Sequence, residues 1–305
     1  MSIDLSQFPW RMKVALYFFF EGAGAGCYFI SILLELLRAP LSALAGVGLV
    51  MGVVLVLLGA AFLWLDLGKK TRFYWSVMNV KKSWIARGVV FVTLFLVLGV
   101  SYILCAIWPS VWLDEVYLLK VAWGSLSALF ALAISVYPAM LLKSCKPFKL
   151  WDNAMIVVFF VILSLLTGMA TLLVVPFVAS LKLGITTEIL NSFRFGLAVC
   201  NGLLIAGIIT FGIYLHSVYV ATISGRASIL KLMQGEFRSL LIVTVIVGWI
   251  LPLVFVSVGL FTGSAVKTVW VSLTSVILLL AGSLLIRYIL LAAATREVPF
   301  LQDLM

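Results

Sequence analysis

The stretch from Ala43 to Leu65 reads ALAGVGLVMGVVLVLLGAAFLWL, an apolar run without one charged side chain. A helix needs about 20 consecutive apolar residues to cross the hydrocarbon core of a bilayer, so this run predicts a transmembrane helix. It ends in a charged and aromatic block, Asp66-Leu67-Gly68-Lys69-Lys70-Thr71-Arg72-Phe73-Tyr74-Trp75. Lys, Arg and Trp at a membrane boundary anchor the neighbouring helices and offer a docking surface.

Seven further apolar runs of similar length lie before and after this one. The chain of 305 residues is 65% hydrophobic and 10% charged, which leaves too little polar surface for a water-soluble globule. No segment shows the alternation of transmembrane barrel strands, so we expect an all-α integral membrane protein with eight transmembrane helices. The predicted spans are 12–37, 43–65, 87–107, 117–142, 154–178, 195–221, 239–261 and 268–293.

No linker or long loop interrupts the spans, so residues 1–305 are predicted to form a single domain. The segment Phe18–Gly26 has a faint echo in residues 159–169. This echo suggests that the eight helices form two four-helix bundles.

The distribution of charge predicts the orientation in the membrane. The formal net charge is +10, and about fifteen of the 21 Lys and Arg residues lie on the side that holds both termini. By the positive-inside rule, the N- and C-termini are predicted to be cytoplasmic. Because these basic residues sit in loops between spans, the rule accounts for them, and nucleic-acid binding is not expected.

Polar residues inside the spans are functional candidates, because an unpartnered polar group in the bilayer is costly. A helix rises about 1.5 Å per residue. By this count Glu21, Tyr137, His216 and Arg287 lie at a similar depth, roughly 8–13 Å from the side of the membrane that holds both termini. Asp66 ends the second span on the same side. An acid, a phenol, an imidazole and a guanidinium in one layer could surround a quinone head group and move its protons.

Each of these residues also has a purely structural explanation. Glu21 and Arg287 could form an ion pair, His216 could reach toward the interface, and Tyr137 could belong to an aromatic belt. The glycines Gly22, Gly24 and Gly26 are typical of a close helix-packing face. At the far end of the first span, Glu35 and Arg38 are three residues apart, which predicts an interfacial pair.

Redox metal sites are not indicated by the sequence. Membrane subunits that carry haem b hold each iron between two histidines, and this chain has only His216, so a bis-His haem is excluded. The four cysteines lie singly, with no metal-binding spacing. Electrons would therefore reach a bound quinone from a partner docked at the membrane surface. The basic loop at 66–87 is the expected docking surface, through Lys69, Lys70, Arg72, Lys81 and Lys82.

Five segments together resemble the NrfD-like membrane subunits, a family that includes the membrane anchor of polysulfide reductase. These segments are Phe20–Gly26, Leu65–Phe73 followed by Ser83–Gly88, Tyr137–Ser144 leading to Pro147-Phe148, Gly248–Pro252, and Gly282–Tyr288. They occur in the family's order, and the similarity covers nearly the whole chain.

The resemblance implies a quinone-binding subunit (menaquinone or ubiquinone) in a prokaryotic inner membrane. It implies electron exchange with a ferredoxin-like iron–sulfur subunit, which serves a catalytic subunit, often a molybdopterin enzyme. The main catalytic site would then lie in that other subunit. By this resemblance the quinone pocket would lie near Glu21 and Tyr137. The polar residues in the spans add His216 as a third candidate, with Tyr17, Asp66 and Arg287 in support.

Two features differ from the pattern of the family. The polysulfide reductase anchor has Asn and His near the start of its first helix, where this chain offers Arg11, Lys13, Tyr17 and Glu21. In much of the family the partner-bearing face looks outward, whereas charge here predicts a cytoplasmic face.

Two other functions are compatible with the sequence. A secondary transporter or proton-translocating module would use the buried Glu21, Asp66 and Arg287 as an ion path. A purely structural anchor would tolerate replacement of these charges and bind no quinone.

Overall fold

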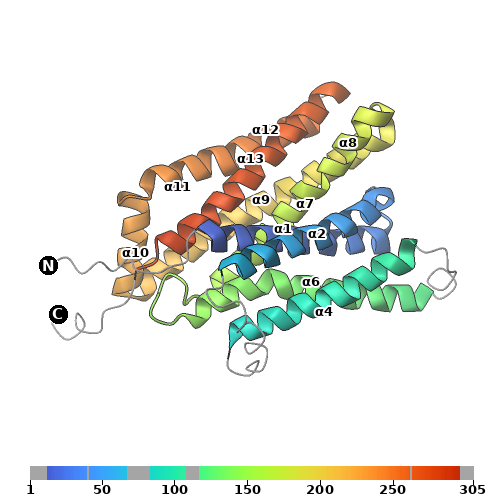
Figure 1. The fold of residues 1–305 in the computed structure, drawn as a ribbon. Helices are drawn as coiled ribbons and strands as arrows, with labels where there is room; N and C mark the ends of the chain where they lie inside the picture. The colour runs from blue at the N-terminus through green and yellow to red at the C-terminus, as the bar shows by residue number, and fades with distance from the viewer. Residues whose placement is uncertain (1–11, 40, 67–82, 108–116, 262, 296–305) are drawn as a thin grey trace, which may run out of the picture.

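The computed structural model describes residues 12–39, 41–66, 83–107, 117–261 and 263–295, and it is shown in Figure 1. Throughout these ranges the regular structure is helical, and eight segments are long and apolar enough to cross a membrane. The predicted all-α membrane fold is therefore confirmed. Because the number of crossings is even, α1 begins at the same end of the molecule at which α13 ends. We call this end the N-terminal face.

The first four spans are single helices. They are α1 (Met12–Leu37), α2 (Ala45–Asp66), α4 (Trp84–Ile107) and α6 (Tyr117–Ser144). A short 3₁₀ turn, η1 (Ser42–Leu44), leads from α1 into α2. All four lie within two or three residues of the ranges that hydropathy predicts.

The last four spans are more irregular. The fifth consists of α7 (Met155–Leu172) and α8 (Val174–Leu183), the sixth is α9 (Thr187–Ala221), the seventh runs through α11 (Arg238–Val245), η3 (Ile246–Ile250) and α12 (Leu251–Phe261), and the eighth is α13 (Ala265–Ala292). The η3 segment is a π-helix, in which the Leu251 N–H bonds the Ile246 carbonyl. Pro252 follows it and has no N–H to donate, which fits a local change of helix pitch.

The connection between the fifth and sixth spans is much shorter than the predicted 179–194. Helix α8 continues to Leu183, Gly184 adopts a left-handed φ of 75°, and α9 starts at Thr187. The Thr186 hydroxyl caps α9 by accepting a hydrogen bond from the Ile189 N–H at 3.3 Å. The polar residues Glu188 and Arg194, which fall between the two predicted spans, lie in the first turns of this helix.

The connection predicted at 222–238 contains a helix, α10 (Ile223–Gln234). The Thr222 hydroxyl caps its start by accepting a hydrogen bond from the Gly225 N–H at 3.0 Å. Its buried face packs beside α9 and α11. With 12 residues it is too short to span the bilayer.

Helix α1 is the centre of the fold. It packs against α2, α6, α7 and α13, so it touches both the first four and the last four spans (Figure 1). Glycines permit the closest approaches. A Cβ at Gly24 would lie 2.7 Å from the Val56 nitrogen of α2, and one at Gly168 of α7 would lie 2.7 Å from the Gly26 Cα. The division into two four-helix bundles stays a prediction.

The predicted pairing of Glu35 with Arg38 is wrong. Helix α1 ends at Leu37, and Arg38 turns into the left-handed region with a φ of 50°, so the two residues do not share a helical face. Glu35 instead forms an ion pair with Lys120 of α6 at 2.9 Å and accepts a hydrogen bond from the Tyr102 hydroxyl of α4 at 3.1 Å.

Candidate functional site

Glu21 is a carboxylic acid sealed inside the first four spans. Glu21 is 0% exposed, and in the described part of the chain neither carboxylate oxygen makes a hydrogen bond of good geometry, although the Tyr17 hydroxyl lies close enough to interact with it. The backbone here is approached closely by α2, where a Cβ at Gly59 would lie 2.9 Å from the Glu21 nitrogen. Burying an acid with so few hydrogen bonds costs free energy, so Glu21 does not stabilise the fold. Its presence at this depth instead indicates a function.

Two phenols accompany Glu21. Tyr17 lies one helical turn earlier on α1, so it shares the face of Glu21. Tyr137 comes from α6, and both tyrosine side chains are buried. The three groups interact electrostatically, Tyr17 with both Glu21 and Tyr137, and Tyr137 with Glu21. We refer to Tyr17, Glu21 and Tyr137 as the acid–phenol cluster.

Glycine fixes the position of the Tyr137 ring. Gly88 of α4 lies directly against this ring, where a Cβ would fall 2.7 Å from the Tyr137 Cε1 and closer still to other ring atoms. Because no other residue lacks a Cβ, Gly88 lets α4 and the phenol share this space. The Ser83–Gly88 segment and the Tyr137–Ser144 segment, which are far apart in sequence, therefore meet at one contact.

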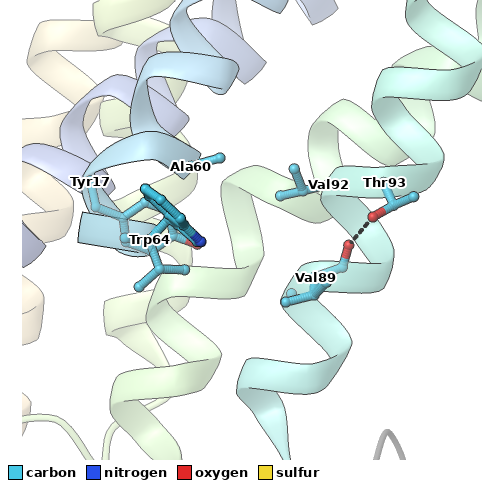
Figure 2. Close-up of a pocket in the computed structure, with 8 residues that line it drawn as sticks. Tyr17, Ala60, Trp64, Val89, Val92 and Thr93 are labelled. Carbon is cyan, nitrogen blue, oxygen red and sulfur yellow. Dashed lines mark hydrogen bonds between the residues drawn. The ribbon is translucent and has the colours of Figure 1, made fainter. Parts of the chain in front are cut away.

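A cavity of about 120 Å³ lies next to the cluster, between α2 and α4 (Figure 2). It is lined by Tyr17, Ala60, Leu63, Trp64, Gly88, Val89, Val92 and Thr93. Figure 2 shows Tyr17, Ala60 and Trp64 on one wall and Val89, Val92 and Thr93 on the other. A single buried water needs only roughly 10–15 Å³, so the cavity can take a larger group.

The chemistry of the cavity is mainly apolar, with few polar atoms. The Thr93 hydroxyl is engaged by the Val89 carbonyl at 2.8 Å, which leaves Tyr17 as the lining residue that also touches Glu21 and Tyr137. Trp64 is 48% exposed at the rim, at the level of the membrane-spanning helices. Tyr17 therefore lies between the apolar cavity and the buried carboxylic acid of Glu21.

Arg287 is also fully buried, but it lies elsewhere. Its Nη1 donates to the Ser283 carbonyl at 3.1 Å, and its guanidinium carbon lies 5.8 Å from the centre of the Phe19 ring. No ion pair joins Arg287 to Glu21 or to another carboxylate in the part of the chain that the structure describes. The structural ion pair that the sequence allowed is therefore not formed.

Comparison with protein-family models identifies the relatives of this chain. The model described as polysulphide reductase, NrfD matches residues 2–299. The chain belongs to the NrfD family. Members of this family are membrane subunits of quinone-linked oxidoreductases and normally pair with iron–sulfur and catalytic subunits. A search among curated proteins finds no match.

The NrfD-family chain does not bring every predicted residue to the cluster. His216 is exposed on α9, a helix that packs mainly on α7, α10, α12 and α13. Asp66 is the last residue of α2, and its side chain lies outside the described part. The docking residues Lys69, Lys70, Arg72, Lys81 and Lys82 also lie outside the described residues.

The sequence did not predict most of the residues that line the cavity, and it indicated only a supporting role for Tyr17. Ala60 and Val92 carry no chemical signal of a site, since apolar residues are typical of any transmembrane helix, and the Thr93 hydroxyl is bonded within its own helix. For Tyr17 a signal existed, because it precedes Glu21 by four residues and so must share its helical face. Among the described residues, no three His, Cys, Asp or Glu side chains gather to hold a metal ion.

The residues present fit a quinone. A quinone has two carbonyl oxygens that accept hydrogen bonds, a flat ring and an apolar tail. Tyr17 and Tyr137 carry hydroxyl donors, Gly88 leaves room beside a ring, and the apolar walls of α2 and α4 suit a tail.

Proposed function

We propose that this chain binds the quinone that its complex oxidises or reduces, in the cavity between α2 and α4. One observation carries the proposal. A fully buried acid, Glu21, lies with two phenols, and one of these phenols, Tyr17, lines an otherwise apolar cavity within the membrane-spanning region. That is the combination a lipid-soluble molecule with a proton-accepting head requires.

Each residue of the cluster has a separate part in this proposal. A bound quinone takes up two electrons and two protons on reduction, and its quinol returns them on oxidation. Tyr17 and Tyr137 orient the head group by donating hydrogen bonds to its oxygens. Glu21, which is next to both phenols, holds a proton or releases it. Packing of Gly88 against Tyr137 keeps the second phenol in place.

The electrons come from or go to a partner. Within this proposal the partner is a ferredoxin-like iron–sulfur protein, linked to a catalytic subunit such as a molybdopterin enzyme. It docks on the basic loop of Lys69, Lys70, Arg72, Lys81 and Lys82, with the N- and C-termini in the cytoplasm. Support comes from the family and from the charge of the loop.

The proposal is tested by binding of a fluorescent quinone analogue, 2-heptyl-4-hydroxyquinoline N-oxide, to the purified full chain. Quenching of its fluorescence gives the Kd. We expect Tyr17→Phe, Tyr137→Phe and Glu21→Gln each to weaken binding by about tenfold, which corresponds to about 1.4 kcal/mol. Each change removes a hydroxyl or a carboxylate while nearly keeping the shape.

Matched controls come from the same chain. Tyr117→Phe removes a hydroxyl from an exposed tyrosine at the start of α6, and Glu188→Gln neutralises an exposed acid at the start of α9. Neither lies at the cavity, so both should bind as the unchanged chain does. Absence of binding by the unchanged chain, or an equal effect of cluster and control variants, would refute the assignment.

A further inference from the structure

Arg287 is a buried charge that the proposed quinone site does not use. It is 0% exposed and lies on α13, five residues before the helix ends at Ala292. At about 1.5 Å per residue this places its backbone roughly 8 Å inside the end of the span. A guanidinium stays protonated under all ordinary conditions, so the charge persists there and must be solvated by something.

The hydrogen-bond donors of Arg287 are mostly unused by the protein. Nη1 donates to the Ser283 carbonyl, whereas Nε and Nη2 are buried without a hydrogen-bond partner among the residues that the structure describes. The Ser283 hydroxyl, one turn earlier on the same helix, is likewise buried without a partner among them. In native proteins most buried polar atoms have a hydrogen-bond partner. Three unpartnered polar atoms on adjacent turns of α13 therefore need an explanation beyond the packing of the helix.

Arg287 Nη2 lies at a junction of three helices, α1, α7 and α13. A Cβ at Gly22 of α1 would lie 2.9 Å from Arg287 Nη2 and 2.7 Å from the Ser164 hydroxyl of α7. Arg287 and Ser164 therefore converge on the same point of α1, and the Phe19 ring lies 5.8 Å from the guanidinium carbon. Donors and acceptors from α7 and α13 thus meet beside a residue that has no side chain.

Glu21 does not supply the missing partner. It is the neighbour of Gly22 on α1, and successive residues of a helix point about 100° apart. Its carboxylate belongs with Tyr17 and Tyr137. In the described part of the chain, no carboxylate comes within ion-pair distance of Arg287.

We propose that Arg287, Ser283 and Ser164 hold a cluster of internal water between α1, α7 and α13. Buried water is bound where two to four polar partners converge, and this junction offers Nε, Nη2 and two hydroxyls. Water satisfies the guanidinium where lipid cannot. It also places exchangeable protons one residue along α1 from Glu21, on a side of the helix other than the one facing the cavity.

Hydroxyl-radical footprinting with synchrotron X-rays tests this site, because X-rays form radicals from internal water as well as from bulk water, and radicals formed inside the protein modify buried side chains next to them. The full chain is irradiated in detergent without any quinone, and modification is measured residue by residue by mass spectrometry. Phe19 lies beside the guanidinium and is only partly buried, so radicals from bulk water also modify it, and the part of its modification that depends on Arg287 reports the internal water. In Arg287→Met its modification should be several-fold slower, and in Ser283→Ala it should be intermediate.

Phe18 is the internal control. It is 1% exposed and packs edge-to-face on Phe160 with ring centres 6.0 Å apart, so it should resist modification in every variant. A rise at Phe18 in Arg287→Met would mean that this variant is misfolded, and Ser283→Ala then decides. The proposal is overturned if Phe19 is as resistant as Phe18 in the unchanged chain, or if the decisive variant modifies Phe19 at the unchanged rate. Quinone plays no part in the readout, so its outcome is separate from that of the quinone site.

Discussion

Gly26 of α1 and Gly168 of α7 pack backbone against backbone where the first and fifth spans cross. A Cβ at Gly168 would lie 2.7 Å from the Gly26 Cα and closer still to the next peptide group, and a Cβ at Gly26 would collide with the Ser164 carbonyl. These two glycines fall in the pair of segments that echo each other in the sequence. The echo therefore coincides with a contact that joins the first four spans to the last four.

Replacing either glycine by alanine should separate these helices. Backbone atoms cannot yield as a flexible side chain can, so we expect Gly168→Ala to destabilise the folded chain by about 2 kcal/mol or more. The measurement is thermal unfolding of the purified chain in detergent. Gly212→Ala on α9 is the matched control, because nothing lies within 4 Å of its added Cβ. Gly212→Ala should be neutral or slightly stabilising, and an equal loss in both variants would contradict the prediction.

The contact of Gly88 with Tyr137 predicts a more local effect. A methyl group at residue 88 would press on the Tyr137 ring and fill part of the cavity, which Gly88 also lines. We therefore expect Gly88→Ala to weaken binding of the quinone analogue by about tenfold, or about 1.4 kcal/mol.

The control for Gly88→Ala is Gly202→Ala, where the added Cβ meets open space on α9. It should bind the analogue normally. If Gly88→Ala binds as tightly as the unchanged chain while Tyr137→Phe does not, the cavity can absorb the methyl group, and the role given to Gly88 is wrong.

Hydropathy was sufficient to find all eight spans, because the need to bury the backbone in lipid constrains composition over some 20 residues. It was insufficient at their ends. Polar residues such as Glu188 and Arg194 can lie in the first turns of a helix near the interface, and α10 is too short and too polar to stand out. Local hydrogen bonds from Thr186 and Thr222 decide where these helices begin.

Depth along a helix was likewise a partial guide to the site. It brought Glu21 and Tyr137 into one layer, and the structure places them together. It gave the same depth to His216 and Arg287, which lie elsewhere. Depth fixes the position along the axis but not the direction around it, and that direction follows from how the helices pack.

His216 illustrates this difference and yields a prediction. Its side chain is exposed on α9, away from the acid–phenol cluster, so His216→Asn should leave binding of the quinone analogue within about twofold of the unchanged value, or about 0.4 kcal/mol. Fluorescence quenching measures this, with Glu21→Gln in parallel as the variant that should fail. A tenfold loss in His216→Asn would place the quinone near α9 instead of between α2 and α4.

Glu35 and Lys120 should be energetically coupled across the far end of α1 and α6. Their ion pair is 2.9 Å long, with each side chain 25% exposed, so a double-mutant cycle of Glu35→Ala and Lys120→Ala should give a coupling of about 1 kcal/mol. Glu35→Ala should be the worse single change, because it also leaves the Tyr102 hydroxyl without its acceptor. The same cycle with Arg38→Ala should show no coupling, and a coupling there would restore the pairing expected from sequence.

Trp151 ties the connection between the fourth and fifth spans to the end of the eighth. Its Nε1 donates to the Leu290 carbonyl at 2.8 Å, and the residue is fully buried. Leu290 lies in the last turn of α13, where carbonyls have no partner within the helix. Trp151→Phe keeps an aromatic ring but leaves this carbonyl unsatisfied, so thermal unfolding should show that the free energy of unfolding falls by about 1–3 kcal/mol.

Trp270→Phe is the control. It changes a tryptophan that is 58% exposed, so it should lower the free energy of unfolding far less. Equal losses would mean that ring volume, and not the hydrogen bond, determines the stability of this junction.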